Sequence, residues 1–198
     1  MADTRSPRRA GPPPDAATLH DAALTYLARY AATEASLRRV LQGRVDRWQR
    51  LAERGGLDTE VGAAEAAKAR DAVRTVLARL VAAGAVNDAA YAESRARSLV
   101  RAGHSRRAVA AYLAARGVDP GTVATAMPAS GSSELAAALV LARKRRIGPF
   151  RTGAVPDEAG RRRELGVLAR AGFPQSVARR ALAMEQDQAE ALVNELRR

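Results

Sequence analysis

The sequence predicts an all-α protein, an elongated array of three tandem three-helix units behind a disordered N-terminal tail. Strand-favouring residue types are scarce, because only 4% of the residues are aromatic and Ile147 is the single isoleucine. Helix-favouring Ala, Leu, Arg and Glu dominate instead. Apolar residues recur at steps of three and four along most of the chain, which is the spacing of one helix face. We therefore expect no sheet-based fold.

Prolines, glycines and changes in charge mark the boundaries of five segments in the chain. Proline and arginine crowd the first residues without helical spacing, which is typical of a disordered tail. In chain order we expect a basic, proline-rich disordered tail at 1–17, a first three-helix unit at 18–86 with an extended helix and loop insertion at 46–70, a second three-helix unit at 87–130, a third at 131–183, and a polar tail or helix at 184–198.

The first unit has three apolar stripes with helical spacing. The first helix is expected over about 19–30, and the second begins after Thr33, a residue type suited to the N-cap. The third covers 71–83 and stops at Gly84, the usual glycine position after a helix. Trp48, within the insertion, is expected to attach that insertion to the body of the unit.

Caps define the helices of the second unit. Its first helix begins at Asp88 and ends at Gly103, and its second begins after Ser105 and ends at Gly117. Asp119, which a proline follows, opens a short third helix, because an acid at the N-cap and proline at the first helical position favour a helix start.

The third unit opens with a helix that begins near residue 132 and breaks at Gly148. A loop to about Asp157 follows, and two helices then cover roughly 158–171 and 174–183. Shifting residues 105–127 by 55 positions lays the second unit over the third and matches glycine with glycine at the helix ends. Repeated helical units that contact mainly their neighbours offer a long exposed surface, which such proteins commonly use to bind macromolecules.

The sequence offers little chemistry for catalysis. It contains no cysteine, which excludes disulfides, thiolate catalysis and cysteine zinc sites. Its histidines are His20 and His104, and His104 is expected to be a loop residue because it lies among arginines and not among other ligands. A glycine-rich phosphate loop is missing from the sequence. We therefore expect a protein that is not an enzyme and takes no cofactor or metal.

The N-terminus and the lengths of the apolar runs indicate the cellular location of the protein. The N-terminus lacks the apolar core of a secretory signal, and the longest apolar run falls far short of the roughly 20 residues that span a membrane. We expect a cytoplasmic protein without a membrane partner. A long heptad seam is also lacking, so we expect a monomer.

Positive charge is the strongest functional signal. The net charge is +12, and residues 89–181 carry 17 Arg and Lys against 6 Asp and Glu. Such a chain is attracted to nucleic acid or to acidic protein surfaces, and the residues alone favour neither anion. The candidate partner-binding residues are Arg95, Arg97, Arg101, Arg106, Arg107, Arg143, Lys144, Arg145, Arg146, Arg161, Arg162 and Arg163. Among the aromatic residues we expect Tyr91 and Phe173 in the core and Phe150 exposed in a loop.

Two stretches carry a family resemblance. GAVNDAAYAESRA at 84–96, followed by HSRRAVAAYLAARGVD at 104–119, resembles the core of the RecX family of recombination regulators. The resemblance extends over roughly residues 19–183. The positions that fill the family pattern are Gly84, Val86, Asp88, Tyr91, Ala92, Arg106, Arg107, Leu113, Arg116 and Gly117.

The resemblance implies a fold and a function. It implies three tandem three-helix repeats, no active site, and binding in the helical groove of RecA filaments, with restraint of RecA ATP hydrolysis, strand exchange and SOS co-protease activity. Single- or double-stranded DNA is a further possible partner. The alternative hypothesis is a helical-repeat protein that acts directly on nucleic acid, and basic charge with helical repeats fits it equally well.

Overall fold

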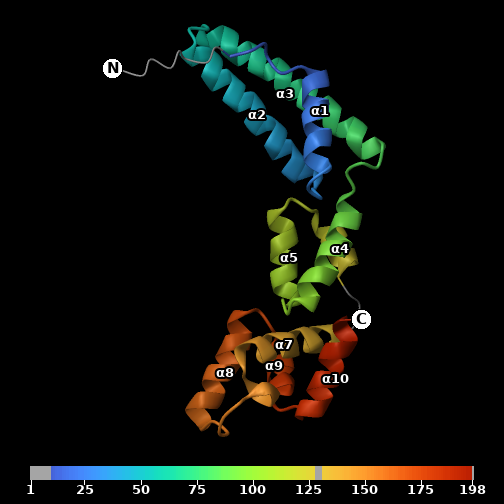
Figure 1. Ribbon diagram of the computed structural model, residues 1–198, viewed down its shortest axis with the longest axis vertical. Helices are drawn as coiled ribbons and strands as arrows, with labels where there is room; N and C mark the ends of the chain where they lie inside the picture. Colours follow the sequence, from blue (N-terminus) through green and yellow to red (C-terminus); the bar gives the residue numbers. More distant parts are fainter. Residues whose placement is uncertain (1–9, 128–130, 198) are drawn as a thin grey trace, which may run out of the picture. The chain divides into compact units, whose positions relative to one another are not determined.

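The computed structural model describes residues 10–127 and 131–197, and all regular structure within these ranges is helical (Figure 1). The prediction of an all-α fold is therefore confirmed. The helices are α1 (Ala16–Leu27), α2 (Glu34–Arg54), α3 (Thr59–Ala82), α4 (Asp88–Arg101), α5 (Arg106–Ala115), α6 (Pro120–Ala126), α7 (Gly131–Arg145), the 3-10 helix η1 (Gly148–Phe150), α8 (Glu158–Arg170), α9 (Gln175–Leu182) and α10 (Gln186–Arg197).

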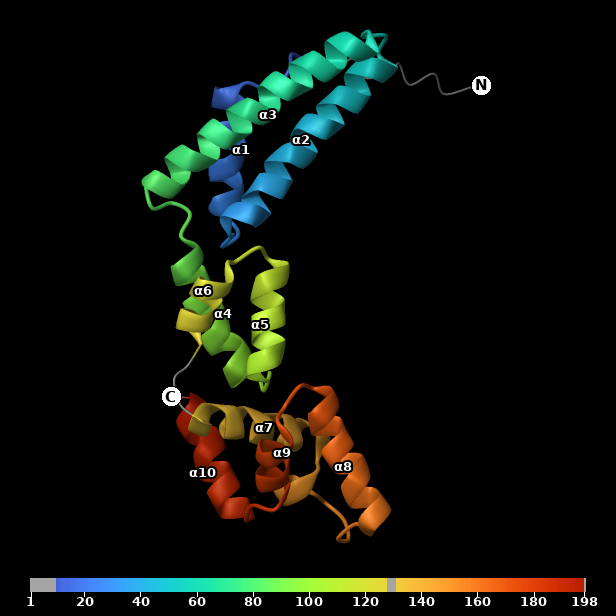
Figure 2. The ribbon, with the colours of Figure 1, turned by 180° about the vertical axis from the view of Figure 1, so that it is seen from behind.

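The chain divides into two compact units, Met1–Asp88 and Ala89–Arg198, and each has its own hydrophobic core. Unit 1 contains α1, α2 and α3. Unit 2 contains α4 to α10, so the segments expected as the second and third three-helix units share one core. Short α6 is partly covered by α4 in Figure 1 and is labelled in Figure 2.

Unit 1 is built on two long helices, α2 and α3, which lie side by side with α1 packed against them (Figure 1). The insertion expected at 46–70 as an extended helix and a loop contains the extended helix, since α2 runs to Arg54, but its loop part is shorter than expected. Only residues 55–58 separate the helices, because the side chain of Asp58 accepts the backbone N–H groups of Glu60 and Val61 and starts α3 early. The first half of α3 buries Ala66 and Ala69, whose small side chains gave a weak apolar stripe.

The expected disordered tail at 1–17 is only partly tested, since residues 1–9 lie outside the described part. Residues 10–17 are ordered, which corrects the expectation for that stretch. Asp15 caps α1 in a reciprocal capping box with Thr18. Trp48 is expected from the sequence to attach the insertion to the body of the unit. Its indole N–H instead donates to the carbonyl of Gly11 at 2.9 Å, so Trp48 attaches the N-terminal segment to α2.

Unit 2 is organised by the caps that the sequence predicts. Ser105 caps α5 and Asp119 caps α6, each by accepting a backbone N–H three residues on. Gly117 and Gly172 follow α5 and α8 with φ of 81° and 93°, a left-handed conformation that glycine adopts without steric cost. The two positions matched by the sequence repeat therefore share one backbone conformation.

The C-terminal segment forms a packed helix. Of the two alternatives for 184–198, tail or helix, the structure shows a helix over Gln186–Arg197. α10 buries Ala189 and Val193 and packs on α7. Within the described ranges, the helices are all too short or too polar to cross a membrane.

Candidate binding surface

All twelve basic residues singled out from the sequence belong to unit 2, in four groups. Eleven of them are exposed and Arg143 is half-buried. Arg95, Arg97 and Arg101 lie on α4, Arg106 and Arg107 open α5, Arg143, Lys144 and Arg145 end α7 with Arg146 directly after it, and Arg161, Arg162 and Arg163 lie on α8. We call this set the basic surface of unit 2.

The start of α5 is fixed by buried polar contacts. The Ser105 hydroxyl accepts the backbone N–H of Ala108 at 3.2 Å and donates to the carbonyl of Ala171 at 2.7 Å. Both carboxylate oxygens of Glu134 on α7 accept the backbone N–H of Arg106, at 2.9 and 3.2 Å. These contacts tie α5 to α7 and to the turn after α8, so the backbone that carries Arg106 and Arg107 is rigidly placed.

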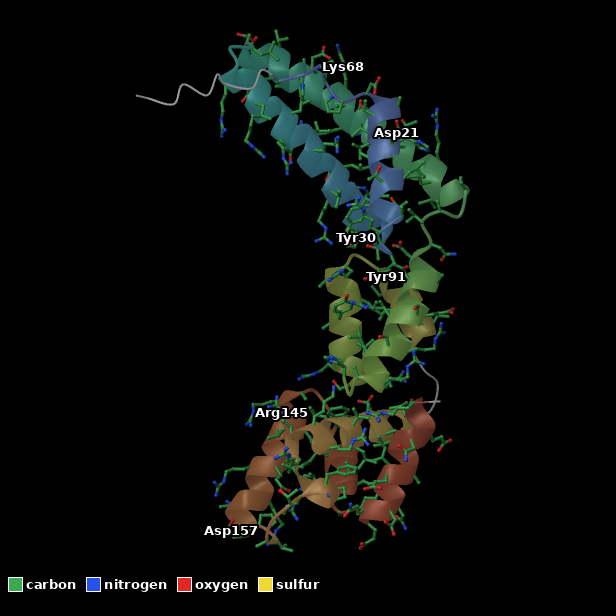
Figure 3. The ribbon with its side chains drawn as sticks, in the orientation of Figure 1. Asp21, Tyr30, Lys68, Tyr91, Arg145 and Asp157 are labelled. Atoms are coloured by element: carbon green, nitrogen blue, oxygen red, sulfur yellow. The ribbon has the colours of Figure 1, made fainter. Side chains whose placement is uncertain are left out.

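The end of α7 presents a second group of charges. Lys144 Nζ donates to the carbonyl of Ala102 at 2.7 Å, which joins the ends of α7 and α4. Arg146 has a φ of 54°, in the left-handed region that ends the helix. Arg145, labelled in Figure 3, is exposed. Within the described part of the chain, the side chains of Arg101, Arg107, Arg143, Arg145 and Arg146 have no hydrogen-bond or ion-pair partner.

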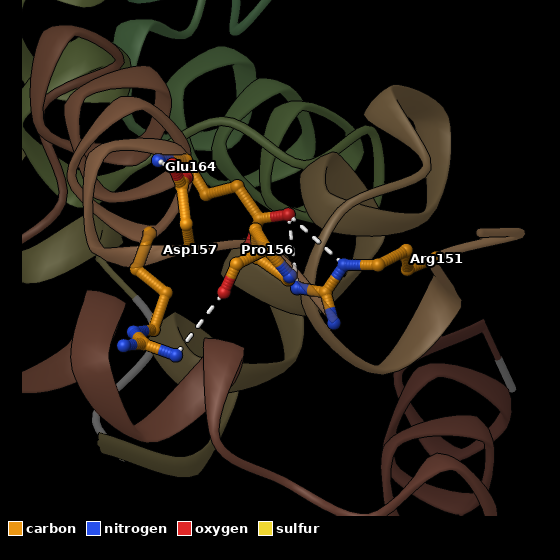
Figure 4. Close-up of polar contacts among 6 residues, drawn as sticks. Arg151, Pro156, Asp157 and Glu164 are labelled. Carbon is orange, nitrogen blue, oxygen red and sulfur yellow. Dashed lines mark hydrogen bonds and ion pairs between the residues drawn. The ribbon is translucent and has the colours of Figure 1, made fainter. Parts of the chain in front are cut away.

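The three arginines of α8 are engaged within their own segment. Arg162 forms an ion pair with Glu158, one turn earlier, and Arg163 Nε donates to the carbonyl of Ala159 at 3.3 Å. Arg161 donates to the Pro156 carbonyl at 3.1 Å. In Figure 4 the Arg151 guanidinium faces the Glu164 carboxylate, and three hydrogen bonds of 2.8 to 3.2 Å join them. The contacts of Arg161, Arg162 and Arg163 are exposed and contribute little free energy, so these three side chains can exchange them for a partner.

The basic surface does not converge on one cavity. Arg97 and Arg101 line a groove of about 310 Å³, and Arg106 with Arg107 lines another of about 490 Å³ that Glu134 and Phe173 also border. Arg161 and Arg162 line a third, of about 450 Å³. A spread of charges over several shallow grooves fits contact with an extended macromolecule better than capture of a small ligand.

A cluster of tyrosines and arginines joins α4 to α5, and sequence reasoning missed it. Arg95 Nε donates to the Tyr112 hydroxyl at 3.0 Å, and the Arg116 guanidinium donates to the Tyr91 hydroxyl at 3.5 Å. Both guanidinium carbons also lie over the Tyr112 ring, at 5.4 and 4.8 Å from its centroid. Arg95 is therefore held in a fixed orientation.

The two hydroxyls of the cluster differ in acidity. Burial raises the pKa of Tyr91, and the neighbouring Tyr112 hydroxyl raises it further. Burial acts on Tyr112 in the same direction, but hydrogen bonds with Tyr91 and Arg95 outweigh it and hold the pKa of Tyr112 below its ordinary value. Of the two phenols, Tyr112 is therefore the more acidic.

The aromatic expectations have mixed outcomes. Phe173 is 4% exposed, so its core position is confirmed. Tyr91 is half-buried, packs against the core of unit 2 and takes part in the tyrosine–arginine cluster, so its expected core position is met only in part. Phe150 is half-buried and packs against the core of unit 2, which corrects the expected exposed loop position. The reason is that η1 turns the chain back onto α7 and α9.

The residues that could bind a metal are scattered. His104 is exposed directly before the Ser105 cap. Across residues 10–127 and 131–197, His, Asp and Glu side chains do not gather in groups of three or more that could hold a metal ion.

Comparison with known proteins places the chain in a family. A family model described as RecX, second three-helix domain, matches residues 87–127, which contain α4, α5 and α6. The chain is 40% identical over 181 residues to the regulatory protein RecX of Myxococcus xanthus, covering 90% of this chain and 89% of that protein. It is 36% identical over 111 residues to the regulatory protein RecX of Agrobacterium fabrum, covering 56% and 59% of the two chains. The chain belongs to the RecX family of regulatory proteins.

Proposed function

We propose that this protein binds RecA filaments through the basic surface of unit 2 and inhibits RecA ATP hydrolysis, strand exchange and SOS co-protease activity. The observation that carries the proposal is the 40% identity to a regulatory protein RecX over nine-tenths of the chain. The protein acts by binding alone, as a cytoplasmic monomer, and takes no part in a chemical step of its own.

The charge distribution supports a polyanionic target. The exposed side chains of Arg101, Arg107 and Arg145 lack an intramolecular partner within the described part of the chain. Carboxylates on RecA, or phosphates of the DNA that RecA holds, pair with these arginines. Either contact weakens as salt rises.

Binding by a rigid protein explains inhibition without catalysis. Ser105 and Glu134 tie α5 to α7 and to the turn after α8, and Lys144 ties α7 to the end of α4. Arginines on α4, α5 and α7 therefore keep their spacing when they meet a partner. A rigid contact that bridges neighbouring RecA subunits opposes their relative motion during ATP turnover. One bound molecule then affects more than one subunit.

The test is single-stranded-DNA-dependent ATP hydrolysis by RecA of the same organism, with preformed filaments titrated from far below stoichiometric to equal protein. The proposal expects hydrolysis to fall at ratios far below one molecule per RecA subunit. Inhibition that begins only when the protein could coat the DNA favours direct DNA binding, and unchanged hydrolysis at equal protein contradicts both.

A charge-reversal variant locates the surface. Arg101→Glu combined with Arg145→Glu is expected to raise the half-inhibitory concentration by about tenfold or more, equivalent to ~1.4 kcal/mol of binding free energy. Arg50→Glu combined with Arg79→Glu is the matched control, because both arginines are exposed in unit 1 and lack a side-chain partner within the described residues. Equal inhibition by the double variant and the control contradicts the assignment to unit 2.

A further inference from the structure

Unit 1 contains a groove between α1 and α2 that the basic surface of unit 2 does not include. Its volume is about 470 Å³. Four arginines and two tyrosines dominate its lining, Arg29, Arg39, Arg44, Arg47, Tyr26 and Tyr30. Tyr30 is labelled in Figure 3, just beyond the end of α1. We call this the α1–α2 groove.

The groove follows from helical spacing on both helices. On α2, Val40, Gly43, Arg44 and Arg47 stand at positions i, i+3, i+4 and i+7, which form one face. On α1, Ala22 and Tyr26 are four residues apart and face the groove in the same way. Each helix therefore contributes a continuous strip.

The electrostatics of the groove are one-sided. None of the described residues that line it is acidic. The side chains of Arg29, Arg44 and Arg47 have no partner within the described part of the chain, and Arg39 makes a single hydrogen bond, to the Ser36 hydroxyl at 3.3 Å.

Carboxylates of α2 lie outside the groove and are already engaged. Glu34 pairs with Arg38, and Asp46 pairs with Arg70 of α3 at 2.9 Å. The four guanidinium groups of the groove are therefore left to attract an anion with several charges.

Aromatic rings provide the second recognition element. The Tyr30 side chain is 57% exposed, among the largest exposures of any bulky apolar residue in the described chain. Tyr26 lies beside it, with ring centroids 5.1 Å apart and planes tilted by 42°, and is half-buried. An exposed ring next to guanidinium groups is the combination on which unpaired nucleobases stack while their phosphates are neutralised.

Gly43 leaves the middle of the groove without a side chain. It lies in the interior of α2, where glycine is less favourable than alanine. A Cβ built there would meet nothing within 4 Å, so no neighbouring part of the chain requires glycine. The missing side chain leaves the backbone of α2 open at the middle of the groove.

We propose that the α1–α2 groove binds a short stretch of single-stranded nucleic acid, with bases against Tyr30 and Tyr26 and phosphates at Arg39, Arg44 and Arg47. A single strand is required because bases in a duplex are not free to stack on a side chain. Residues 39–47 span ~12 Å of helix, which suits a few nucleotides. This site does not depend on RecA and is tested without it.

The experiment is fluorescence anisotropy with the full chain and a fluorescein-labelled dT15 oligonucleotide at several salt concentrations. Tyr30→Ala is expected to weaken binding by about fivefold or more, since one lost stacked base costs ~1–3 kcal/mol. Tyr30→Phe keeps the ring and is expected to bind like the wild type. Arg44→Ala is expected to weaken binding and lower the slope of log K against log salt by ~0.7, the value for one lost contact with a single strand.

Two further variants separate the groove from general charge and from folding. Gly43→Ala is expected to raise Tm, because alanine favours the helix, and yet to weaken binding by filling the groove. Arg50→Ala is the matched control, since Arg50 is exposed on the same helix and does not line the groove; it is expected to change binding less than twofold. Equal weakening by Arg44→Ala and Arg50→Ala overturns the proposal.

Photocross-linking of a bromouridine-substituted strand to the full chain locates the contact. Cross-links within 16–54 are expected. Cross-links confined to 89–197 overturn the proposal and assign the affinity to unit 2. Tyr30→Ala binding as tightly as the wild type also overturns it. Competition by poly-glutamate as strong as that by dT15 also overturns it, because an acidic peptide would then be the better occupant.

Discussion

The carboxylate of Glu134 accepts the backbone N–H of Arg106 through both oxygens, at 2.9 and 3.2 Å, although Glu134 is only 5% exposed. The contact joins α7 to the start of α5 and so supports the basic surface of unit 2. Burial raises the pKa of Glu134, against the opposing effects of the Arg106 amide and the Arg106 charge. The buried carboxylate therefore holds its proton to higher pH than it would in the unfolded chain.

This raised pKa predicts the direction of a pH effect on stability. The folded state binds the proton more tightly, so the contribution is fully present below the ordinary pKa of 4.5 and is lost as pH rises through the higher folded pKa. Glu134→Gln keeps an acceptor for the Arg106 N–H but does not ionise. Its unfolding free energy relative to the wild type is expected to increase from pH 4 to pH 8 in urea titrations. A difference that is constant across this range contradicts the prediction.

The Ser105 hydroxyl is expected to be important for the stability of unit 2. Ser105→Ala removes the cap of α5 and leaves the Ala171 carbonyl without its donor, which together cost ~1–3 kcal/mol. Ser98→Ala, at an exposed position of α4, is the control and is expected to change stability by less than ~0.5 kcal/mol. Chemical denaturation followed by circular dichroism measures both, and equal effects would show that the buried hydroxyl contributes nothing.

Alanine substitutions at two glycines with similar backbone conformations distinguish the free-energy cost of a left-handed backbone from the cost of a steric clash. Gly84 and Gly172 both have positive φ, 71° and 93°. A Cβ at Gly84 would meet nothing within 4 Å, whereas at Gly172 it would lie 2.7 Å from the Ser105 hydroxyl oxygen. Gly84→Ala is expected to cost ~1–2 kcal/mol, the penalty of the left-handed conformation. Gly172→Ala is expected to cost clearly more and to lower Tm further, and the reverse order would contradict the close packing at Gly172.

The indole of Trp48 is expected to hold the N-terminal segment onto unit 1. Trp48→Phe removes the hydrogen bond to the Gly11 carbonyl while keeping an aromatic side chain. Hydrogen exchange at the amides of Asp15 and Thr18 is expected to accelerate, because the segment before α1 loses its attachment. Arg50→Ala, an exposed neighbour on α2, provides the comparison, and unchanged exchange in Trp48→Phe would show that the contact does not order the segment.

The caps of unit 2 could be predicted because they depend on neighbours in sequence. Ser105 and Asp119 each bond an amide three residues away, so residue type and spacing identify them. The early start of α3 escaped prediction because its buried face consists of alanines, whose spacing is lost among the many other alanines of the chain. Ordering of residues 10–15 depends on Trp48, 37 residues away from Gly11, and no local pattern reports it.

The binding residues show the same division. Clusters of arginine in unit 2 are visible in the sequence, but the pairing of Arg95 with Tyr112 is not, because the two lie 17 residues apart on different helices. The α1–α2 groove could not be predicted from the sequence because the net charge of residues 1–88 is small. Residues 1–88 contain 14 Arg and Lys against 11 Asp and Glu, but acids such as Asp46 and Glu34 lie outside the face that carries Arg44 and Arg47.

The most direct measurement of the central claim compares two targets for the full chain at 0.15 M salt. Its affinity is measured for RecA filaments assembled on single-stranded DNA with a non-hydrolysable ATP analogue, and for the same DNA without RecA. A filament regulator is expected to bind filaments at least about tenfold more tightly, a difference of ~1.4 kcal/mol. Equal or tighter binding to the bare DNA would contradict the account and identify the protein as a direct binder of nucleic acid.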